Sequence, residues 1–317
     1  MDILMPTLDR MVFLFAFILI GYLLGKLKLI PDNSAQVLSK LENYLFIPAL
    51  VMGSFISNFT VSKLSEAGTL ILICLAVEAF VLPTAILCAK LCAKDKYQRG
   101  IYTYGLCFSN FGFMGNAVVA AVFPDIFMEY LVFVIGLWVV LYVWGVPSLL
   151  IPKEAGSAPK GFARLKPLLN PMFISMIIGM LIGLSGLTLP SSVDSVIKVS
   201  GDCMSPVAML LTGITVSKID LVQTLKKKGL YIASALRLIV FPVVFMGLIL
   251  LLKIPFSKTV LICLMCSLAM PLGLNTVVVP GAYGKDTSEA AGMALVSHTL
   301  SVITIPLLFS FFLQFIG

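Results

Sequence analysis

Long apolar runs separated by short polar segments dominate the chain. Runs such as 11–24 and 230–252 show no alternation of apolar and polar positions, so membrane helices fit them better than barrel strands. The pattern predicts an all-α membrane protein with ten transmembrane helices. The predicted spans are 11–30, 37–57, 67–92, 100–123 and 128–151 in the first half, and 170–188, 195–217, 229–252, 257–281 and 289–315 in the second.

Residues that bend or break helices recur at an interval of about half the 317-residue chain. The equivalent pairs are Gly21 with Gly179, Gly25 with Gly183 and Pro48 with Pro206 at an interval of 158, and Pro83 with Pro242, Cys107 with Cys266, Asn116 with Asn275 and Pro147 with Pro306 at 159. Because the chain has only 17 prolines, three proline pairs in register are improbable by chance. The register predicts two five-helix repeats, 1–151 and 170–317, joined by a polar linker at 152–169.

The basic residues give the two repeats opposite orientations. Of the 22 Lys and Arg residues, 16 fall on one side of the predicted spans, five fall on the other, and Arg237 lies inside a span. The positive-inside rule therefore places the linker in the cytoplasm and both termini outside a plasma (inner) membrane. Since each repeat has an odd number of spans, the second repeat must be inverted relative to the first.

Composition narrows the class of protein further. The chain is 60% hydrophobic and 12% charged, whereas a soluble domain is about 25% charged. The net charge of +7 comes from basic residues that flank the spans, so we expect a lipid bilayer around the protein and no nucleic acid as partner. The seven cysteines lie in or beside apolar runs and are expected to be buried free thiols, so no metal or other cofactor is predicted.

The sequence offers little support for an enzyme. Its single histidine, His298, lacks the His-Glu-x-x-His spacing of a metalloprotease, and the phosphate-binding pattern G-x-x-x-x-G-K-[ST] does not occur. We therefore expect a non-enzyme that does not hydrolyse ATP.

Spans 4 and 9 contain the strongest helix-breaking signals. Gly112 aligns with Pro271 at the interval of 159, and Gly115 and Gly273 add further weak points nearby. Glycine weakens a helix through backbone entropy, and proline removes a donor and clashes with the preceding turn. Both spans are therefore predicted to be interrupted, and an inverted repeat brings such paired interruptions together near the membrane midplane.

An asparagine follows each predicted interruption. Asparagine is a strong N-cap, so Asn116 and Asn275 are predicted to begin second half-helices. The start of a helix offers free N–H groups and the positive end of the helix dipole, which together hold an anion. The competing interpretation is a kink whose asparagine bonds serve packing alone. Asn110, and Asn43 in span 2, are further candidates to line the binding site.

Four segments give the chain a resemblance to a known family. They are Gly21-Tyr-Leu-Leu-Gly25, Phe46-Ile-Pro48-Ala-Leu, Pro206-Val-Ala-Met-Leu-Leu-Thr-Gly213 and the stretch from Asn275 to Tyr283. This ordered set, which extends over essentially the whole chain, resembles the auxin efflux carrier family. The resemblance is to the bacterial branch related to plant PIN-FORMED carriers, and more distantly to bile-acid:sodium symporters.

The resemblance implies a fold, a substrate class and a binding region. It implies ten helices in two inverted repeats with crossing broken helices 4 and 9, an organic-anion substrate, and a transport domain that moves against a scaffold. The binding region of the family at the crossover carries over to Gly112, Asn116, Pro271 and Asn275. Span 4 departs from the commoner family pattern, because Gly115-Asn116-Ala-Val stands where Leu-Pro usually follows the glycine. This difference bears on how span 4 opens and on which substrate fits.

Four ionisable groups lie inside the predicted spans, where a charge is costly and usually faces a cavity or a partner. Glu78 and Arg237 occupy equivalent repeat positions, and their opposite charges favour either a structural pair or a contact with substrate or gate. Asp202 either takes up H⁺ or Na⁺ or caps local backbone. His298 is either a hydrogen-bonded packing residue or the carrier of a coupling proton.

The leading hypothesis is a secondary active transporter, a permease or efflux carrier, for a small organic anion such as a carboxylate. It would work by alternating access of the elevator type, with H⁺ or Na⁺ as the coupling ion, and a homodimer is compatible with the sequence. The alternative is a channel or membrane sensor that uses the same anion-binding crossover.

Overall fold

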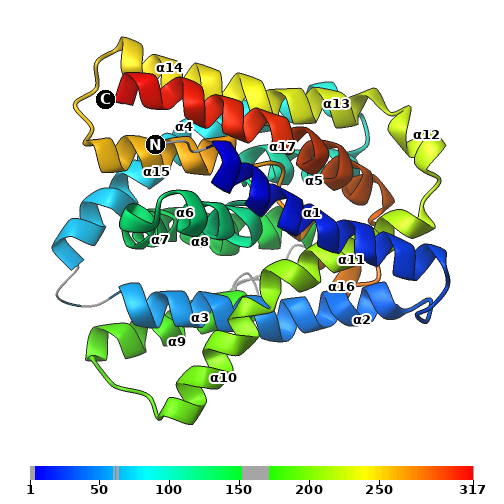
Figure 1. Ribbon diagram of the computed structural model, residues 1–317, viewed down its shortest axis with the longest axis horizontal. Helices are drawn as coiled ribbons and strands as arrows, with labels where there is room; N and C mark the ends of the chain where they lie inside the picture. The colour runs from blue at the N-terminus through cyan, green and yellow to red at the C-terminus, as the bar shows by residue number, and fades with distance from the viewer. Residues whose placement is uncertain (1–3, 60, 62–63, 152–170, 317) are drawn as a thin grey trace, which may run out of the picture.

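The computed structural model describes residues 4–59, 61, 64–151 and 171–316, and helices make up most of these residues (Figure 1). Within these ranges, six helices are long and apolar enough to cross a membrane by length and composition. They are Leu8–Lys26, Ala67–Cys92, Pro124–Leu150, Ser191–Lys218, Lys228–Leu251 and Ser288–Ile316. These helices coincide with predicted spans 1, 3, 5, 7, 8 and 10, and the all-α prediction is confirmed. The predicted linker at 152–169 lies outside the described residues.

The helical segments follow one another closely. The first half has α1 (Leu4–Lys26), α2 (Ser34–Leu41), η1 (Glu42–Phe46), α3 (Ile47–Asn58), α4 (Leu64–Cys92), α5 (Lys96–Cys107), η3 (Phe111–Gly115), α6 (Asn116–Val122), η4 (Pro124–Ile126), α7 (Phe127–Phe133), α8 (Ile135–Val140) and η5 (Leu141–Leu150). The second half has α9 (Pro171–Ser185), α10 (Ser191–Asp202), α11 (Met204–Lys218), α12 (Leu221–Leu225), α13 (Lys228–Ala235), η7 (Leu236–Val240), α14 (Phe241–Leu251), α15 (Lys258–Ala269), α16 (Asn275–Ala282) and α17 (Ser288–Ile316).

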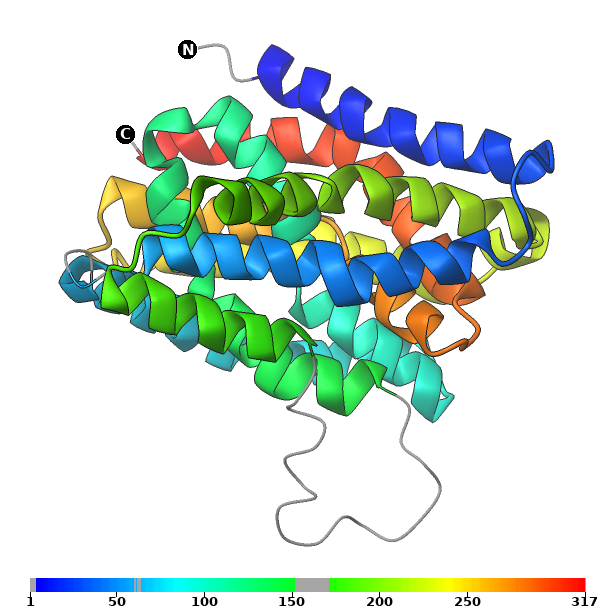
Figure 2. The ribbon, with the colours of Figure 1, turned by 90° about the horizontal axis from the view of Figure 1, so that it is seen from below.

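Two wide π-helical turns precede prolines, one in each half of the chain. The turn η1 ends just before Pro48, and the turn η7 ends just before Pro242. A proline has no N–H to donate and its ring clashes with the carbonyl one turn earlier, so a wider turn accommodates it without ending the helix. As a result α2, η1 and α3 form one continuous rod, which Figure 2 shows across its centre.

The remaining predicted spans differ from simple spanning helices. Spans 4 and 9 are interrupted, and span 2 is the rod of α2, η1 and α3. Span 6 is represented by α9, whose 15 residues extend about 22 Å. That length is shorter than the hydrocarbon core of a bilayer, which is about 30 Å thick.

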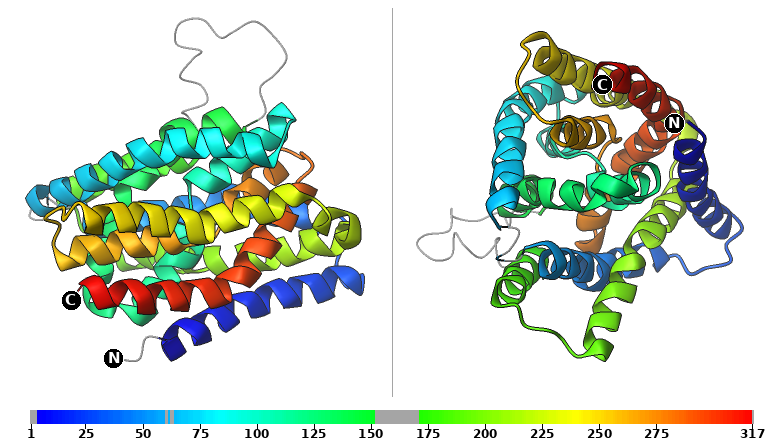
Figure 3. Two further views of the ribbon diagram at one scale, coloured as in Figure 1. Left: turned by 90° about the horizontal axis from the view of Figure 1, so that it is seen from above. Right: turned by 60° about the vertical axis from the view of Figure 1, so that its left-hand side comes forward.

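The helices form two groups. One group contains the neighbours α2, α3, α9 and α10, with α1 packed along α11 at its edge (Figures 1 and 3). The other group contains α4 to α8 and α13 to α17, in which α15 packs against α17 and α4 packs against α5, α7 and α8. The right-hand view of Figure 3 shows α15 and the segments α6 to α8 surrounded by other helices. The interrupted spans belong to the second group, and their second halves α6 and α16 also contact α1 and α2.

Close helix crossings recur at the repeat interval. A Cβ atom on Gly21 would lie within 3.0 Å of the carbonyl oxygen of Leu210, and one on Gly179 within 3.0 Å of that of Met52. Leu210 and Met52 are 158 positions apart, as are the two glycines, so α1 crosses α11 at the same register at which α9 crosses α3. Glycine is required at such crossings because its lack of a side chain lets two helix backbones touch.

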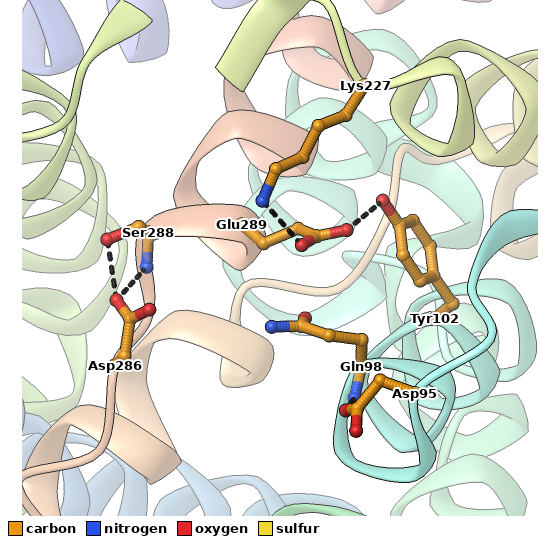
Figure 4. A network of polar contacts seen from close by, with 7 residues as sticks. All are labelled: Asp95, Gln98, Tyr102, Lys227, Asp286, Ser288 and Glu289. Atoms are coloured by element: carbon orange, nitrogen blue, oxygen red, sulfur yellow. Dashed lines mark hydrogen bonds and ion pairs between the residues drawn. The ribbon is translucent and has the colours of Figure 1, made fainter. Parts of the chain in front are cut away.

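A carboxylate joins three segments at one end of the second group (Figure 4). Glu289, at the start of α17, accepts from Lys227 Nζ at 2.7 Å and from the hydroxyl of Tyr102 in α5 at 2.8 Å. In the loop before α17, hydrogen bonds from Ser288 hold the pKa of Asp286 below its usual value. These contacts fix the first half of interrupted span 4 against α17.

Gly21→Ala should destabilise the protein, because the added methyl group meets the backbone of α11 and not a flexible side chain. Overpacking of this kind costs about 1–3 kcal/mol, which a lower Tm of the detergent-purified protein would report. Gly247→Ala in α14 is the matched control, because nothing lies within 4 Å of its added Cβ and alanine is the better helix former. Equal Tm values for the two variants would contradict the role assigned to Gly21.

Candidate functional site

The two interrupted spans meet at their interruptions. The backbone N–H of Asn110 donates to the carbonyl of Pro271 at 2.7 Å, and Ser109 and Leu272 form an isolated antiparallel bridge. The hydroxyl of Ser109 donates to the carbonyl of Ser267 at 2.8 Å. Each span therefore supplies partners for the backbone groups that the other leaves open, which is the condition for non-helical backbone at membrane depth.

The interruption of span 9 lies where the sequence predicts it. Residues 270–274 leave the helix around Pro271, and α16 begins at Asn275. Gly273 allows the two interrupted segments to approach, because a Cβ atom there would lie 2.6 Å from the carbonyl oxygen of Phe108. The side chain of Asn275 does not cap α16, and its Nδ2 donates instead to the hydroxyl of Tyr104 at 2.8 Å.

The interruption of span 4 lies earlier than the sequence predicts. Residues 108–110 leave the helix and η3 begins at Phe111, so Asn116 has helical backbone angles, φ −55° and ψ −45°. Although α6 begins at Asn116, it continues directly from η3, so the prediction that Asn116 caps a half-helix after a break at Gly112 is wrong. Asn110 occupies the N-cap position, and its side chain does not bond to the first turn.

The glycines of span 4 explain this difference. A Cβ atom on Gly112 would lie 3.3 Å from the ring of Trp138, and one on Gly115 would lie within 3.0 Å of the hydroxyl of Tyr130. That hydroxyl donates to the carbonyl of Phe111 at 3.2 Å. The two glycines thus make room for aromatic side chains, and the helix continues through them. Proline imposes a break by lacking a donor, whereas glycine only permits one.

A small cavity of about 20 Å³ lies against the starts of the second half-helices. Residues of both interrupted spans line it, together with aromatic side chains of span 5: Tyr104, Ser109, Asn110, Phe111, Gly112, Phe113, Gly273, Leu274, Asn275, Trp138 and Tyr142 are among them. Among the residues that the structure describes, Oδ1 of Asn110, Oδ1 of Asn275 and the hydroxyl of Tyr142 are buried without a hydrogen-bond partner. A cavity of this size holds about one water molecule. Unsatisfied polar groups and helix starts therefore surround the same space.

A larger open cavity of about 710 Å³ adjoins the small one, because Gly112 and Met204 line both. Its walls come from α1, α3, α10 and α11 on one side and from α6 and α7 on the other. Asn116 lines this cavity with its Oδ1 lacking a partner among the described residues, and the exposed carboxylate of Asp202 lines it at the end of α10. Asn116 and Asp202 thus face the space between the two helix groups and do not lie at the crossing itself.

Three residues of the larger cavity were missed as site residues. Arg10, Asp194 and Lys198 line this cavity, although the sequence had not indicated any of them as a site residue. The sequence of α10 does contain a signal of a charged cavity wall. Asp194, Lys198 and Asp202 recur every four residues and so share one face of a helix.

Arg237 contacts the ends of both first half-helices. Its side chain is 2% exposed and extends from the π-helical turn η7. It donates to the carbonyl of Leu106 at 3.1 Å, of Ser267 at 2.9 Å and of Met270 at 3.2 Å. Carbonyl groups at the end of a helix lack intrahelical partners, and a cation is favourable there. Arg237 therefore caps the two ends at once.

Glu78 lies close to this cap without pairing directly with it. Its buried carboxylate accepts from the thiol of Cys107 at 2.8 Å. Within the described part of the chain, the direct ion pair within 4.0 Å is the one between Lys227 and Glu289. Glu78 and Arg237 nevertheless line a common cavity of about 10 Å³. The equivalence of these two positions in the repeats thus brings them near each other, with the thiol beside the carboxylate.

His298 connects span 10 to the interruption of span 4. Its Nδ1 lies 2.8 Å from the carbonyl of Ala294, which only accepts, so Nδ1 carries the hydrogen of the neutral ring. Nε2 is then the acceptor for Nδ2 of Asn110, also at 2.8 Å. The small cavity beside the ring is otherwise lined by apolar side chains of α1, η3, α11 and α17. This geometry matches the packing interpretation of His298, and a coupling role stays a prediction.

Asn43 does not reach the crossing. It is buried in the π-helical turn η1 and lines neither the small nor the larger cavity. Its neighbour Glu42 is fully buried, and both carboxylate oxygens have no hydrogen-bond partner among the described residues. One turn further along, Ile47 lines the small cavity. A substrate contact by Asn43 stays a prediction.

Interrupted membrane helices that cross around a cavity are a feature of transport proteins, and comparison with protein families agrees. The chain matches the model of the membrane transport protein family over residues 6–309, almost its full length. It therefore belongs to this family, the auxin efflux carrier family, as the four sequence segments had indicated. Comparison with curated proteins gives no significant match. The protein is thus a multi-pass membrane transport protein, of a family of transporters and not of enzymes.

His298→Gln should leave the protein stable, because the glutamine amide still offers an acceptor to Asn110. His298→Leu removes that acceptor and leaves a buried donor unpaired, which costs about 1–3 kcal/mol and should lower the Tm in detergent. We further expect His298→Gln to keep the wild-type dependence of ligand binding on pH, measured from about pH 6 to 8. Loss of that dependence at an unchanged Tm would show instead that His298 carries a proton.

Proposed function

We propose that this protein is a secondary active transporter of a small organic anion, most simply a carboxylate, which binds where the two interrupted helices cross. One observation carries the proposal. The starts of both second half-helices and the unpartnered hydroxyl of Tyr142, which can donate a hydrogen bond, lie around one small cavity, and that cavity adjoins a large open one. In a family of membrane transport proteins, this is the place where a polar substrate gains most from binding.

The preference for an anion follows from the direction of the helix segments. The second half-helices present free N–H groups and the positive end of their dipoles to the small cavity. The larger cavity contributes no net charge from Arg10, Lys198, Asp194 and Asp202, because these two cations and two anions balance. Selectivity for an anion therefore rests on backbone groups at the crossing, as at other helix starts that bind anions.

Alternating access explains the difference between the two cavities. A volume of about 20 Å³ is far below the roughly 300–1,000 Å³ of ligand pockets in general. A substrate would have to enter by way of the larger cavity, and the crossing would have to open for it. Because the larger cavity lies between the two helix groups, a shift of the group α4 to α8 and α13 to α17 against the other would open and close it. Such a shift is an elevator-type movement.

The proposal includes ten spans in two inverted repeats, 1–151 and 170–317. The equivalent crossings of Gly21 with α11 and of Gly179 with α3 support this arrangement. The basic residues then place both termini outside and the linker in the cytoplasm. In that orientation Arg10 and Lys198 lie on the outer side, so the larger cavity faces outward in this conformation.

Single cysteines placed by Lys94→Cys and Lys198→Cys test this orientation, since both side chains are exposed. We expect a membrane-impermeant maleimide added outside intact cells to label position 198 and to label position 94 only after the cells are opened. The wild-type chain, whose cysteines are buried or half-buried, provides the background. The reverse pattern of labelling would invert the topology.

A channel and a membrane sensor are the alternatives for the same crossing. A channel predicts flux that neither saturates nor supports counterflow, whereas a carrier in proteoliposomes gives saturable counterflow. A sensor would bind the anion without moving it. The small volume at the crossing, about 20 Å³, favours a carrier, because an organic anion could pass only after a conformational change.

A thermal-shift screen of mono- and dicarboxylates tests the binding site, run with and without Na⁺ and at several pH values. We expect at least one carboxylate to raise the Tm, and Asn275→Ala and Asn116→Ala each to weaken its binding by about 10- to 100-fold. Nδ2 of Asn275 donates to Tyr104 in this conformation and would turn to the carboxylate when the substrate binds. The factor corresponds to one lost hydrogen bond to a charged group, about 1.5–3 kcal/mol. Asn33→Ala, exposed in the loop before α2, is the control. Wild-type affinity in both site variants, with intact folding, would remove the crossing as the binding site.

A further inference from the structure

Arg237 occupies the position where the two interrupted helices present their carbonyl ends. In transporters with broken helices, such half-helix ends and unwound carbonyls are the groups that coordinate Na⁺. Here three of these carbonyls, from Leu106, Ser267 and Met270, accept hydrogen bonds from one guanidinium group. We propose that Arg237 takes the place of a bound Na⁺, so that the crossing neither binds nor requires Na⁺.

The guanidinium of Arg237 offsets the charge of the two helix ends. A helix end carries about half a negative charge, so the ends of α5 and α15 together present about one. The guanidinium supplies one positive charge that does not titrate in a protein. It also has five donors in a rigid fork, which is why one side chain reaches carbonyls from two helices and from the unwound segment. A point charge such as Na⁺ would do the same work by coordination.

The carbonyl of Ser267 and the volume beside Arg237 leave little room for a cation. The carbonyl oxygen of Ser267 accepts from Arg237 and also from the hydroxyl of Ser109 at 2.8 Å, which uses both of its lone pairs. The cavity beside the guanidinium, which Glu78 also lines, measures about 10 Å³. That volume is at the lower limit for a single water molecule, so an ion cannot be added beside Arg237 without displacing it.

Glu78 would become a ligand of a Na⁺ site if the guanidinium of Arg237 were removed. Its carboxylate lines the same cavity as Arg237 and is buried. Without the guanidinium, the site would contain a carboxylate and three carbonyl oxygens around an empty volume. Such a set of oxygen ligands, with a net negative charge, favours a small cation. Loss of the single side chain of Arg237 would therefore turn a crossing that does not bind Na⁺ into one that does.

The site of Arg237 is separate from the anion cavity. It lies at the ends of the first half-helices, whereas the small cavity lies at the starts of the second ones. The inference therefore does not depend on which anion binds, and Na⁺ itself serves as the probe.

The experiment measures Na⁺ binding to full-length protein in detergent. Tm is followed as NaCl replaces choline chloride or KCl at constant ionic strength, and binding of radioactive Na⁺ is measured by scintillation proximity. We expect no Na⁺-specific change for the wild type. Arg237→Met, which keeps an unbranched apolar stem and removes the charged guanidinium, should gain a saturable rise in Tm and saturable Na⁺ binding. Arg237→Lys should behave like the wild type, because it retains a cation.

Two further variants test whether the gain of Na⁺ binding depends on Glu78 and on the loss of Arg237 in particular. The double variant Arg237→Met with Glu78→Gln should bind Na⁺ at least tenfold more weakly than Arg237→Met alone, because it lacks the carboxylate. Arg99→Met, at the start of α5, is the matched control for loss of an arginine and should show no response to Na⁺. Saturable Na⁺ binding by the wild type would overturn the proposal. An Arg237→Met protein that gains no stability from Na⁺, whether folded or not in choline chloride, would overturn it too.

Discussion

The hydrogen-bonded crossing of two interrupted helices is the constraint on which the rest of this structure depends. An open backbone inside a membrane is costly unless protein or water satisfies it. Here the N–H of Asn110 and the carbonyl of Pro271 satisfy each other, and the hydroxyl of Ser109 reaches across to Ser267. The remaining carbonyl ends are capped by Arg237.

The two sides of the crossing differ in the sign of the helix-end charges that they present. The negative ends of the first half-helices converge on a buried arginine, and the positive ends of the second half-helices surround a small cavity with unpartnered polar groups. A space that is positive without a side-chain cation can hold an anion and release it again, because no buried ion pair has to be broken. Aromatic side chains of span 5 close the cavity, and the two glycines of span 4 make room for them.

Some of this was accessible from the sequence. The paired prolines and glycines led to the interrupted spans, and Pro271 located the break of span 9 correctly because proline removes a donor wherever it stands. The break of span 4 was misplaced, since Gly112 and Gly115 were taken for weak points although they are contact points for Trp138 and Tyr130. A glycine can either weaken a helix or make room for a neighbouring side chain, and only the packing of the neighbouring helix shows which of the two it does.

The sequence by itself determined the class of this protein: a helical membrane protein with a duplicated pattern and two broken spans, in a recognisable family. Hydropathy and helix-breaking residues act locally along the chain, so they can be read from it directly. The tertiary structure decided the partners across the fold. It placed His298 on Asn110, Arg237 on three carbonyls and Asn116 in the open cavity. Those contacts join residues from 30 to 188 positions apart in the chain, and helix packing, not local preference, sets the distance between them.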